Sequence, residues 1–501
     1  MNRSHDGYQA AGKLAGMAHS TPAQPKLPNR MVPYSEAFKS FIAEDWADES
    51  EPSQAMPASA HTPARRRAIQ ARFPHDRLIV PSGGLKVRSN DCDYAYRAHS
   101  AFAHLTGLGS QAEPEMVLVI EDGQAVLYFH GRVPRTDPEF YSCARYGEMW
   151  VGARPSLGQM AARTGLVVRD SGELDSALAA PLVHGDGQVR VVPGVDPRVS
   201  ALVDALRGRD DSADSELEVA LSELRLVKDG FEVEQMESAC AATKVGFDAV
   251  IADLPEAVRR GRGERWVEGV FGLHARHLGN CVGYDTIAAG GEHACTLHWM
   301  RNDGDLRDGD LLLLDAGVEV DSLYTADITR TLPVSGRLSP VQRRVYEAVL
   351  AAQQAGIEAA RPGASFMDVH RAAIEVIAQH LADWGILPVS VEQTLDDDGG
   401  QFRRWMVHNT SHHLGLDVHD CAQARHRMYR GGKLKPGMII TVEPGLYFKS
   451  TDLMVPEEFR GIGVRIEDDV LITNRGCRVL SDGFPRDPDA VEAWIAEVQG
   501  R

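Results

Sequence analysis

The sequence has no apolar run that approaches the roughly 18 residues a membrane-spanning helix needs. Its first twenty residues, MNRSHDGYQAAGKLAGMAHS, also lack the apolar core of a secretory signal. The seven cysteines are scattered without a C-x-x-C pair, which argues against a disulfide framework and against a thiolate zinc site. We therefore expect a cytoplasmic protein with no membrane partner.

Positive charge is in short supply, because 53 Lys and Arg residues face 71 Asp and Glu residues, for a formal net charge of −18. Such a chain is repelled by phosphate backbones, so nucleic acid is not an expected partner. A G-x-x-x-x-G-K-[ST] motif is missing, and the glycines of GIGVRI, Gly461 and Gly463, lack the third glycine of a dinucleotide fingerprint. The sequence gives no indication of a bound nucleotide.

The chain is otherwise of ordinary globular composition, with 501 residues of which 43% are hydrophobic. The pattern predicts a flexible extension over residues 1–35 and an α/β domain with a mixed sheet over residues 36–215. In this domain apolar runs such as EMVLVIE and QAVLYFHG alternate with helical patterns. The segment GRDDSADSE interrupts the pattern near residue 215, where a second domain over residues 216–490 is expected to begin.

Two short segments near the start allow simple interpretations. Phe38, Phe41 and Trp46 fall at helical spacing, which predicts a helix that either docks on the body or lies in solvent as an acidic helix. The basic run over residues 65–67 is interpreted as the solvated face of a helix.

The second domain contains the same alternation of helices and strands twice, which suggests an internal duplication. Helices are predicted over residues 264–277, 342–360 and 367–384, and strands near Thr286, near Leu311, over residues 438–443 and over residues 463–473.

Two aspartates lie on the apolar runs of this domain. Asp315 ends the run LLLLD, and Asp327 lies within the following strand, in TADITRT. A buried carboxylate costs several kcal/mol unless something compensates it, and a cation is one such compensation. A strand-end aspartate that accepts hydrogen bonds from a turn is an equally acceptable interpretation of each one alone.

Histidines are concentrated in HNTSHHLGLDVHD, which contains His408, His412, His413 and His419. The spacing of the first two matches the zincin motif H-E-x-x-H, but Asn409 stands where the catalytic glutamate belongs, so the zincin interpretation fails. One or two of these imidazoles remain candidate metal ligands supplied by a loop or strand.

Two glutamates complete the candidate set. Glu443 ends an apolar strand in ITVEPGLY, and Glu467 lies inside the strand GIGVRIEDDVLIT, where a solvated strand face would also explain it. Four carboxylates with at least one histidine suit Mn²⁺, Co²⁺, Fe²⁺ or Zn²⁺. Two such ions sharing bridging oxygens would activate a hydroxide and polarise a carbonyl, the two-metal route to amide hydrolysis.

The phrases DAG, DITRT, HNTSHHLGLDVHD, VEPGLY and GIGVRIEDD, in this order, resemble the proline-specific aminopeptidases (aminopeptidase P) of the pita-bread metallopeptidases, family M24. The resemblance spans residues 75–485. It implies a creatinase-like α/β domain followed by a pita-bread catalytic domain, and an α/β (α+β) class overall. It also implies two divalent ions per subunit, most often Mn²⁺, and a homodimer or homotetramer in which the N-terminal domain of one subunit closes the site of another.

By this resemblance each functional residue has an expected role. The metal ligands would be Asp315, Asp327, His412, Glu443 and Glu467, with Asp327 and Glu467 bridging both ions. Glu443 would also take the proton from the attacking water. His298, His408 and His419 would line the substrate site and stabilise the tetrahedral intermediate. Arg465 would orient the carboxylates. Without the resemblance His298 would be interpreted as a packed turn histidine.

Three positions depart from the family pattern. The connection between Asp315 and Asp327 is one residue longer than expected, His413 replaces a bulky apolar residue, and Ala101 in HSAF replaces an acidic residue. None of these changes removes an expected ligand.

The expected activity is release of the first residue from peptides whose second residue is proline. A prolidase, which cleaves only Xaa-Pro dipeptides, shares all five ligands, and the full GIGVRIEDD phrase favours the aminopeptidase. A pita-bread protein that has lost its metal and serves as a binding protein is the third alternative. It is disfavoured because an abandoned site would leave four buried carboxylates repelling one another.

Overall fold

The computed structural model describes residues 34–47 and 53–500, and the chain divides into two compact units, Met1–Leu221 and Ser222–Arg501. Most of the extension predicted over residues 1–35 therefore lies outside the described residues. In the described part of the chain no helix combines the length and apolarity that crossing a membrane requires. The segment GRDDSADSE does not interrupt the structure, because most of it belongs to helix α10 (Asp211–Leu224), whose first turn carries acidic residues that suit the helix dipole.

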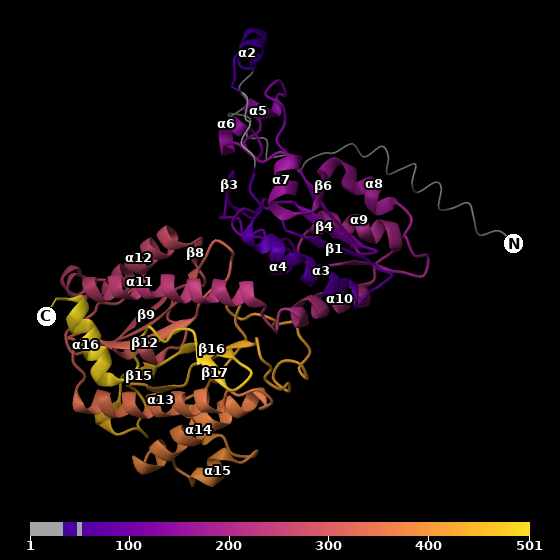
Figure 1. The fold of residues 1–501 in the computed structure, drawn as a ribbon. Helices are drawn as coiled ribbons and strands as arrows, with labels where there is room; N and C mark the ends of the chain where they lie inside the picture. Colours follow the sequence, from indigo (N-terminus) through magenta and orange to yellow (C-terminus); the bar gives the residue numbers. More distant parts are fainter. Residues whose placement is uncertain (1–33, 48–52, 501) are drawn as a thin grey trace. The chain divides into compact units, whose positions relative to one another are not determined.

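The first unit is an α/β domain built on a five-stranded mixed sheet of order β6-β5-β4-β1-β7. Strands β1 and β4 and strands β4 and β5 pair antiparallel, whereas the outer pairs β1 with β7 and β5 with β6 are parallel. Figure 1 shows α8 and α9 on one side of this sheet and α3 and α4 on the other. The strands are β1 (Arg77–Pro81), β4 (Val117–Glu121), β5 (Gln124–Phe129), β6 (Val167–Asp170) and β7 (Val189–Val191), and the helices are α3 (Thr62–Gln70), α4 (Ser100–Thr106), α7 (Leu157–Thr164), α8 (Leu174–Ala179) and α9 (Pro197–Arg207).

The early aromatic residues contact the body on one side only, because no residue of their helix is buried and Phe41 is 74% exposed. Helix α2 (Glu36–Phe41) begins at the N-cap Ser35, whose hydroxyl accepts a hydrogen bond from the Phe38 amide. The Phe38 ring packs edge-on against Tyr141, with ring centres 5.3 Å apart. The Trp46 ring, which follows the helix, packs edge-on against Phe140 at 5.5 Å.

The basic run over residues 65–67 was predicted to be solvated, and for two of its members this is wrong. Arg65 and Arg66 are buried, and they donate hydrogen bonds to the carbonyl oxygens of His104 and Leu105 at the end of α4. Ala101, the departure from the family pattern in this unit, is buried in the same helix.

The second unit places short antiparallel sheets between two pairs of long helices (Figure 1). Each half of the unit supplies one helix pair and then one three-stranded sheet, of order β12-β10-β9 in the first half and β13-β16-β17 in the second. The elements are α11 (Gly230–Arg260), α12 (Gly263–Leu278), β9 (Ile287–Gly290), β10 (Leu311–Ala316), β12 (Ile328–Pro333), α13 (Pro340–Ala359), α14 (Phe366–Asp383), β13 (Ile439–Val442), β14 (Gly445–Phe448), β15 (Ile462–Arg465), β16 (Asp468–Ile472), β17 (Cys477–Val479) and α16 (Pro488–Val498).

Capping boxes mark the starts of two of these helices. Asp229 forms a capping box with Glu232 at the start of α11, and Ser339 forms one with Gln342 at the start of α13. The buried faces of α14, β13 and β16 then form one apolar core, represented by Val369, Ile440 and Val470. The three long helices predicted from periodicity are confirmed to within a few residues as α12, α13 and α14.

Two strand assignments from the sequence are wrong, and both concern acidic residues. Asp327 does not lie within a strand but directly precedes β12. The strand predicted over residues 463–473 is two strands, because β15 pairs with β14 whereas β16 pairs with β13. The chain changes sheets at Ile466 and Glu467, and the amide of Glu467 donates instead to the carbonyl of Thr329 at 3.1 Å. Glu467 therefore does not lie on a solvated strand face, since it is 1% exposed.

The longer connection between the two aspartates leaves the register of their strands regular. Asp315 is paired with Thr329 and Ala316 with Ile328 across β10 and β12. The connecting residues turn at Leu323, which adopts a positive φ of 70°. The extra residue is thus absorbed outside the strand pair.

A buried ion pair joins β12 to β16, and its removal tests how much it contributes to the stability of this unit. Arg330 is completely buried and donates to Asp468 Oδ1 at 2.8 Å and to the carbonyl oxygens of Glu467 and Phe484. We expect Arg330→Ala to lower the free energy of unfolding of this unit by about 3–5 kcal/mol, because it removes the closest cation from the buried Asp468, whose other ion pair, with Arg486, is longer at 3.7 Å, and leaves the carbonyl oxygens of Glu467 and Phe484 without this donor. Thermal unfolding of the variant measures the loss.

Arg371→Ala is the matched control, because Arg371 forms a solvent-exposed pair with Asp368 on α14. We expect it to change the same free energy by about 0.5 kcal/mol or less. Equal effects of the two substitutions on the free energy of unfolding would contradict a stabilising role of the buried Arg330 pair.

Candidate metal centre

One cavity of about 500 Å³ in the second unit brings together all nine residues to which the resemblance assigns a role. Its lining includes Asp315, Asp327, His412, Glu443, Glu467, His298, His408, His419 and Arg465. They come from segments far apart in the chain, so the fold and not local sequence creates the site.

Strand ends and strand breaks position the acidic residues. Asp315 lies at the end of β10, and Glu443 follows β13 directly. Asp327 and Glu467 occupy the irregular positions described above, where the chain enters β12 and leaves β15. Side chains at such positions are free to turn into the cavity, because they are not bound to the alternation of a regular strand.

The histidine segment runs beside β13 and is tied to it by hydrogen bonds. The Thr441 amide donates to the carbonyl of His412 at 3.0 Å, and the His412 amide donates to Thr441 Oγ1 at 3.1 Å. The amide of Glu443 donates to the carbonyl of Thr410 at 2.9 Å. This pairing holds the His412 imidazole and the Glu443 carboxylate against the same space.

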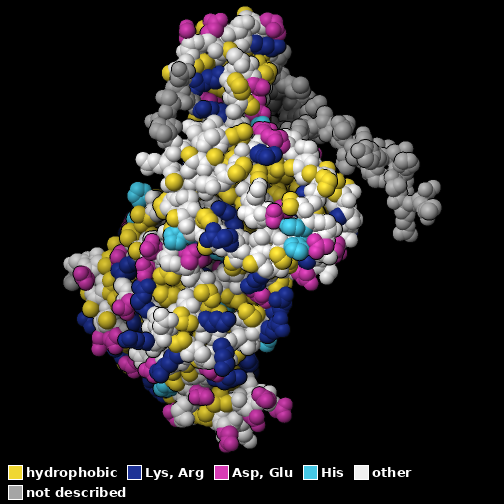
Figure 2. All heavy atoms as spheres, turned by 45° about the vertical axis from the view of Figure 1, so that its right-hand side comes forward, with side chains coloured by type: hydrophobic (Ala, Val, Ile, Leu, Met, Phe, Trp, Pro, Cys, Tyr) yellow, Lys and Arg dark blue, Asp and Glu magenta, His cyan; other side chains and the backbone are white. Residues whose placement is uncertain are grey.

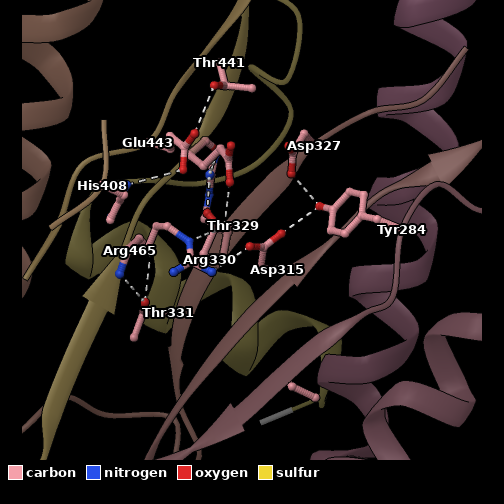
Figure 3. A network of polar contacts seen from close by, with 12 residues as sticks. Tyr284, Asp315, Asp327, Thr329, Arg330, Thr331, His408, Thr441, Glu443 and Arg465 are labelled. Carbon is pink, nitrogen blue, oxygen red and sulfur yellow. Dashed lines mark hydrogen bonds and ion pairs between the residues drawn. The ribbon is translucent and has the colours of Figure 1, made fainter. Parts of the chain in front are cut away.

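Asp327, His412 and Glu467 form the tightest group, with one ligand atom from each within 4.8 Å of the others. The His412 Nε2 atom lies 3.2 Å from Asp327 Oδ2 and 3.5 Å from Glu443 Oε1. Figure 3 shows Asp315, Asp327 and Glu443 around one shared space. These donors are hard carboxylate oxygens and one imidazole, which suit a divalent cation.

One atom of the group lacks the partner that a cation would provide. Glu467 Oε2 accepts a hydrogen bond from Thr329 Oγ1 at 2.6 Å, but Oε1 is buried and receives no hydrogen bond within the described part of the chain. A buried carboxylate oxygen without a donor costs free energy, and a metal ion would satisfy it. The residues therefore fit the metal that their donor set implies.

The electrostatics of the cavity reflect crowded negative charge. Burial and the neighbouring carboxylates raise the pKa of Glu467 well above its ordinary value, and burial raises the pKa of Glu443 to about 7. Burial lowers the pKa of His412, but the hydrogen bond to Asp327 and the charge of Glu443 outweigh it and raise that pKa to about 9. Burial raises the pKa of Asp327, but its contact with His412 brings it below the ordinary value.

Tyr284 is a member of the site that the sequence analysis missed. Its Oη lies 2.7 Å from Asp315 Oδ1 and 2.5 Å from Asp327 Oδ1, so its single O–H is shared between the two carboxylates (Figure 3). The only signal available was its place before a predicted strand, in VGYDT, and a tyrosine there is more often a packing residue.

Arg465 connects the metal-side residues to the rest of the pocket. Its Nη2 donates to Asp315 Oδ2 at 2.6 Å, its Nη1 to Tyr447 Oη at 3.0 Å and its Nε to Thr329 Oγ1 at 3.1 Å. A buried guanidinium with three fixed acceptors holds Asp315 in one orientation.

The contacts of His408 determine its tautomer. Burial and the charge of Arg465 lower the pKa of His408 to about 3, so the ring is neutral at pH 7. Nδ1 lies 2.8 Å from the carbonyl oxygen of Asn409, which accepts only, so Nδ1 carries the hydrogen. Nε2 therefore accepts from Tyr447 Oη at 2.8 Å. Tyr447 is a second member of the site that the sequence analysis did not single out.

The other histidines of the segment separate into two environments. The ring of His419 packs edge-on against His412 at 4.5 Å on the cavity side. His413 does not line the cavity, because its buried ring stacks on Phe366 at 5.2 Å and contacts Tyr429 at 4.5 Å. The departure at His413 thus replaces one packing residue with another and leaves the cavity unchanged.

Comparison with known proteins agrees with this geometry. Residues 234–474 match metallopeptidase family M24, and residues 62–189 match the N-terminal domain of aminopeptidase P. The chain is 50% identical over 472 residues to Xaa-Pro aminopeptidase 1 of Streptomyces coelicolor, covering 93% of each chain. It is 32% identical to the Xaa-Pro aminopeptidase of Escherichia coli, covering 86% of this chain and 96% of that one.

Solved structures give the same result for the fold. The aminopeptidase PepP of Pseudomonas aeruginosa superposes with a TM-score of 0.78 at 31% identity, over 89% of this chain and all of that one. Aminopeptidase P of E. coli in complex with substrate superposes with a TM-score of 0.76 at 29% identity, over 90% of this chain. The expected creatinase-like and pita-bread architecture is confirmed, and the chain belongs to metallopeptidase family M24 as a metal-dependent aminopeptidase.

Proposed function

We propose that the protein hydrolyses the bond between the first residue and a proline in second position at the N-terminus of peptides. The observation that carries this proposal is the meeting of nine expected site residues in one cavity of a chain whose relatives at 47–50% identity are named Xaa-Pro aminopeptidases. The proposed substrates are peptides with proline at the second position.

The proposed ligands of two divalent ions, with Mn²⁺ as the proposed metal, are Asp315, Asp327, His412, Glu443 and Glu467. The ions would supply positive charge that activates water and polarises the scissile carbonyl. Glu443 accepts the proton of the attacking water, a role supported by its buried place on the cavity wall. Arg465 holds Asp315 in place through its Nη2.

The substrate side of the cavity is assigned to three histidines. His408 is proposed to line the region of the substrate carbonyl as a neutral ring, whose orientation is fixed because the Asn409 carbonyl and Tyr447 occupy its two nitrogens. His298 and His419 line the same cavity and are proposed to contact the proline and the tetrahedral intermediate.

A prolidase remains the second candidate function, because it requires the same five ligands. The relatives favour the aminopeptidase, since both units are matched and the chain covers 93% of the S. coelicolor enzyme. The distinction depends on how much peptide the cavity accepts beyond the proline.

Further proposals concern the whole particle. We place the N-terminal domain at residues 36–215 and the catalytic domain at residues 216–490, and we propose a homodimer or homotetramer in the cytoplasm. All seven cysteines are free, which supports a reducing compartment. Nucleic acid is not a proposed partner, given the net charge of −18 and the interspersed acidic and basic side chains on the face in Figure 2.

Three substrates decide between the candidate functions. We expect the Mn²⁺-loaded protein to release the first residue from an Xaa-Pro-Xaa tripeptide and to leave a Met-Ala-Xaa tripeptide intact, because the cavity is assigned to a proline ring. Mass spectrometry of the products gives the answer. Cleavage of an Xaa-Pro dipeptide alone would make the protein a prolidase, and no cleavage of any of the three would overturn both enzyme assignments.

Metal binding is expected to strengthen as pH rises. Without metal, His412 and Glu443 hold protons up to about pH 9 and about pH 7, and a metal ion must displace these protons. Both folded-state pKa values lie above the unfolded values, so the metal-free protein loses stability as pH rises from about 4.5 through about 9. The stabilisation by Mn²⁺, measured as a shift in melting temperature, should therefore be larger at pH 8 than at pH 5.5, and a shift independent of pH would contradict the ligand assignment.

Asp327 provides the direct test of a ligand. We expect Asp327→Ala to lose activity by about 100-fold or more and to bind less Mn²⁺, because it removes one of the three residues in the candidate metal-binding group, the others being His412 and Glu467. Circular dichroism should show an intact fold. Asp397→Ala, which removes an exposed carboxylate of the same unit, is the control. Wild-type turnover in Asp327→Ala would show that the assignment is wrong.

A further inference from the structure

A second buried carboxylate lies outside the metal centre and holds one wall of its cavity. Glu264, in the first turn of α12, is fully buried. One of its oxygens accepts from the Gly290 amide at 2.8 Å and from His293 Nδ1 at 2.7 Å. The other accepts from Trp299 Nε1 at 2.8 Å and from the Gly304 amide at 2.7 Å. Burial of this charge is therefore matched by four donors.

All four donors belong to one segment, residues 290–304, which we call the cavity loop. Donors at both ends of the loop and two within it meet on the same carboxylate, so Glu264 closes the loop on itself. The glycine at position 304 makes this possible, because a Cβ there would lie 2.8 Å from Glu264 Oε2. The His293 and Trp299 rings, which both donate to Glu264, stack at 3.9 Å.

A second buried side chain reinforces the same loop. Asn302 adopts a positive φ of 46° and is fully buried. Its Oδ1 accepts from the Ala288 amide at 3.0 Å, and its Nδ2 donates to the carbonyl of Thr286 at 2.8 Å. The loop is thereby bound to β9, next to the cavity.

The cavity loop carries Leu297, His298 and Met300 into the wall of the metal cavity. It contains none of the five proposed metal ligands. His298 directly precedes Trp299, whose indole is fixed by Glu264. The position of the His298 ring therefore depends on the Glu264 contacts, whereas the ligand positions depend on the strands.

We propose that Glu264 is a positioning residue that holds the cavity loop, and through it His298, at the distance from the metal centre that substrate requires. This inference rests on the proposed function, because it gives His298 a substrate contact. A change of about 1 Å in such a group is enough to reduce turnover by about 100-fold.

The test is a double-mutant cycle with Mn²⁺-loaded protein and an Xaa-Pro-Xaa tripeptide. We expect Glu264→Gln to lower kcat/KM by about 100-fold with Mn²⁺ content unchanged, because the glutamine NH₂ opposes two N–H donors. In a His298→Ala background the same substitution should cost no more than about threefold, since Glu264 acts through His298. If the losses of kcat/KM from Glu264→Gln and His298→Ala are fully additive, the proposal is overturned, because a structural role of Glu264 that does not act through His298 predicts this result.

Hydrogen exchange gives a readout that does not depend on activity. Glu264→Gln should speed exchange of the amides of residues 291–304 while exchange in β10 and β12 stays unchanged. Unchanged exchange in the cavity loop would overturn the proposal even if activity falls. An inactive wild-type enzyme would overturn the proposed function, and the exchange measurement would still decide whether Glu264 holds the loop.

Two further variants show whether the losses come from the contacts of Glu264, and not from misfolding or from the removal of any buried carboxylate. Trp299→Phe keeps an aromatic ring against His293 but removes one donor to Glu264, and we expect a loss of about 10-fold in the same direction. Glu492→Gln is the matched control. Glu492, on the C-terminal helix α16, is a buried carboxylate that accepts hydrogen bonds from Arg337, Leu338 and Arg343. This substitution should leave both kcat/KM and exchange in the cavity loop unchanged, and a loss equal to that of Glu264→Gln would overturn the proposal.

Discussion

Four carboxylates share one buried cavity, and their mutual repulsion sets the conditions that the surrounding structure has to meet. Part of the charge is met by the chain itself, through the guanidinium of Arg465 on Asp315 and the imidazole of His412 beside Asp327. The hydroxyl of Tyr284 is shared between the same two aspartates. These donors do not satisfy all of the carboxylate oxygens, since Glu467 Oε1 has no hydrogen-bond donor among the described residues. The remaining charge is what a divalent cation would neutralise.

Three of the four proposed acidic ligands lie just outside regular strands, whereas Asp315 lies within β10. A break in a strand frees a side chain from the alternation between two faces, so its carboxylate can turn into the cavity. The chain makes such a break at Glu467, where it leaves one sheet for another, and Thr329 binds both the amide and the side chain of Glu467. Asp327 is held similarly, because its amide donates to the buried carboxylate of Asp469, which also accepts from the Cys240 thiol.

The sequence predicted the fold well wherever local signals are strong. Helical periodicity located α12, α13 and α14, and the run LLLLD located the end of β10. It failed where tertiary contacts decide, as in the break before Glu467 and the burial of Arg65, since a charged residue in an isolated pattern is interpreted as exposed. Tyr284, Tyr447 and Glu264 were missed for a related reason. Each acts through partners distant in sequence, and a single tyrosine or helical glutamate carries no spacing pattern that reveals such partners.

The chain holds its proposed metal ligands and the proposed substrate wall by separate contacts. The proposed ligands lie at the ends of strand pairs, near the buried Arg330, whereas the cavity loop is held by Glu264 and Asn302. A change in the loop can therefore alter which peptides fit while the ligand set stays intact. The five proposed ligands therefore favour metal-dependent hydrolysis without indicating which peptides fit, because Leu297, His298 and Met300 line the cavity from a loop that is held separately.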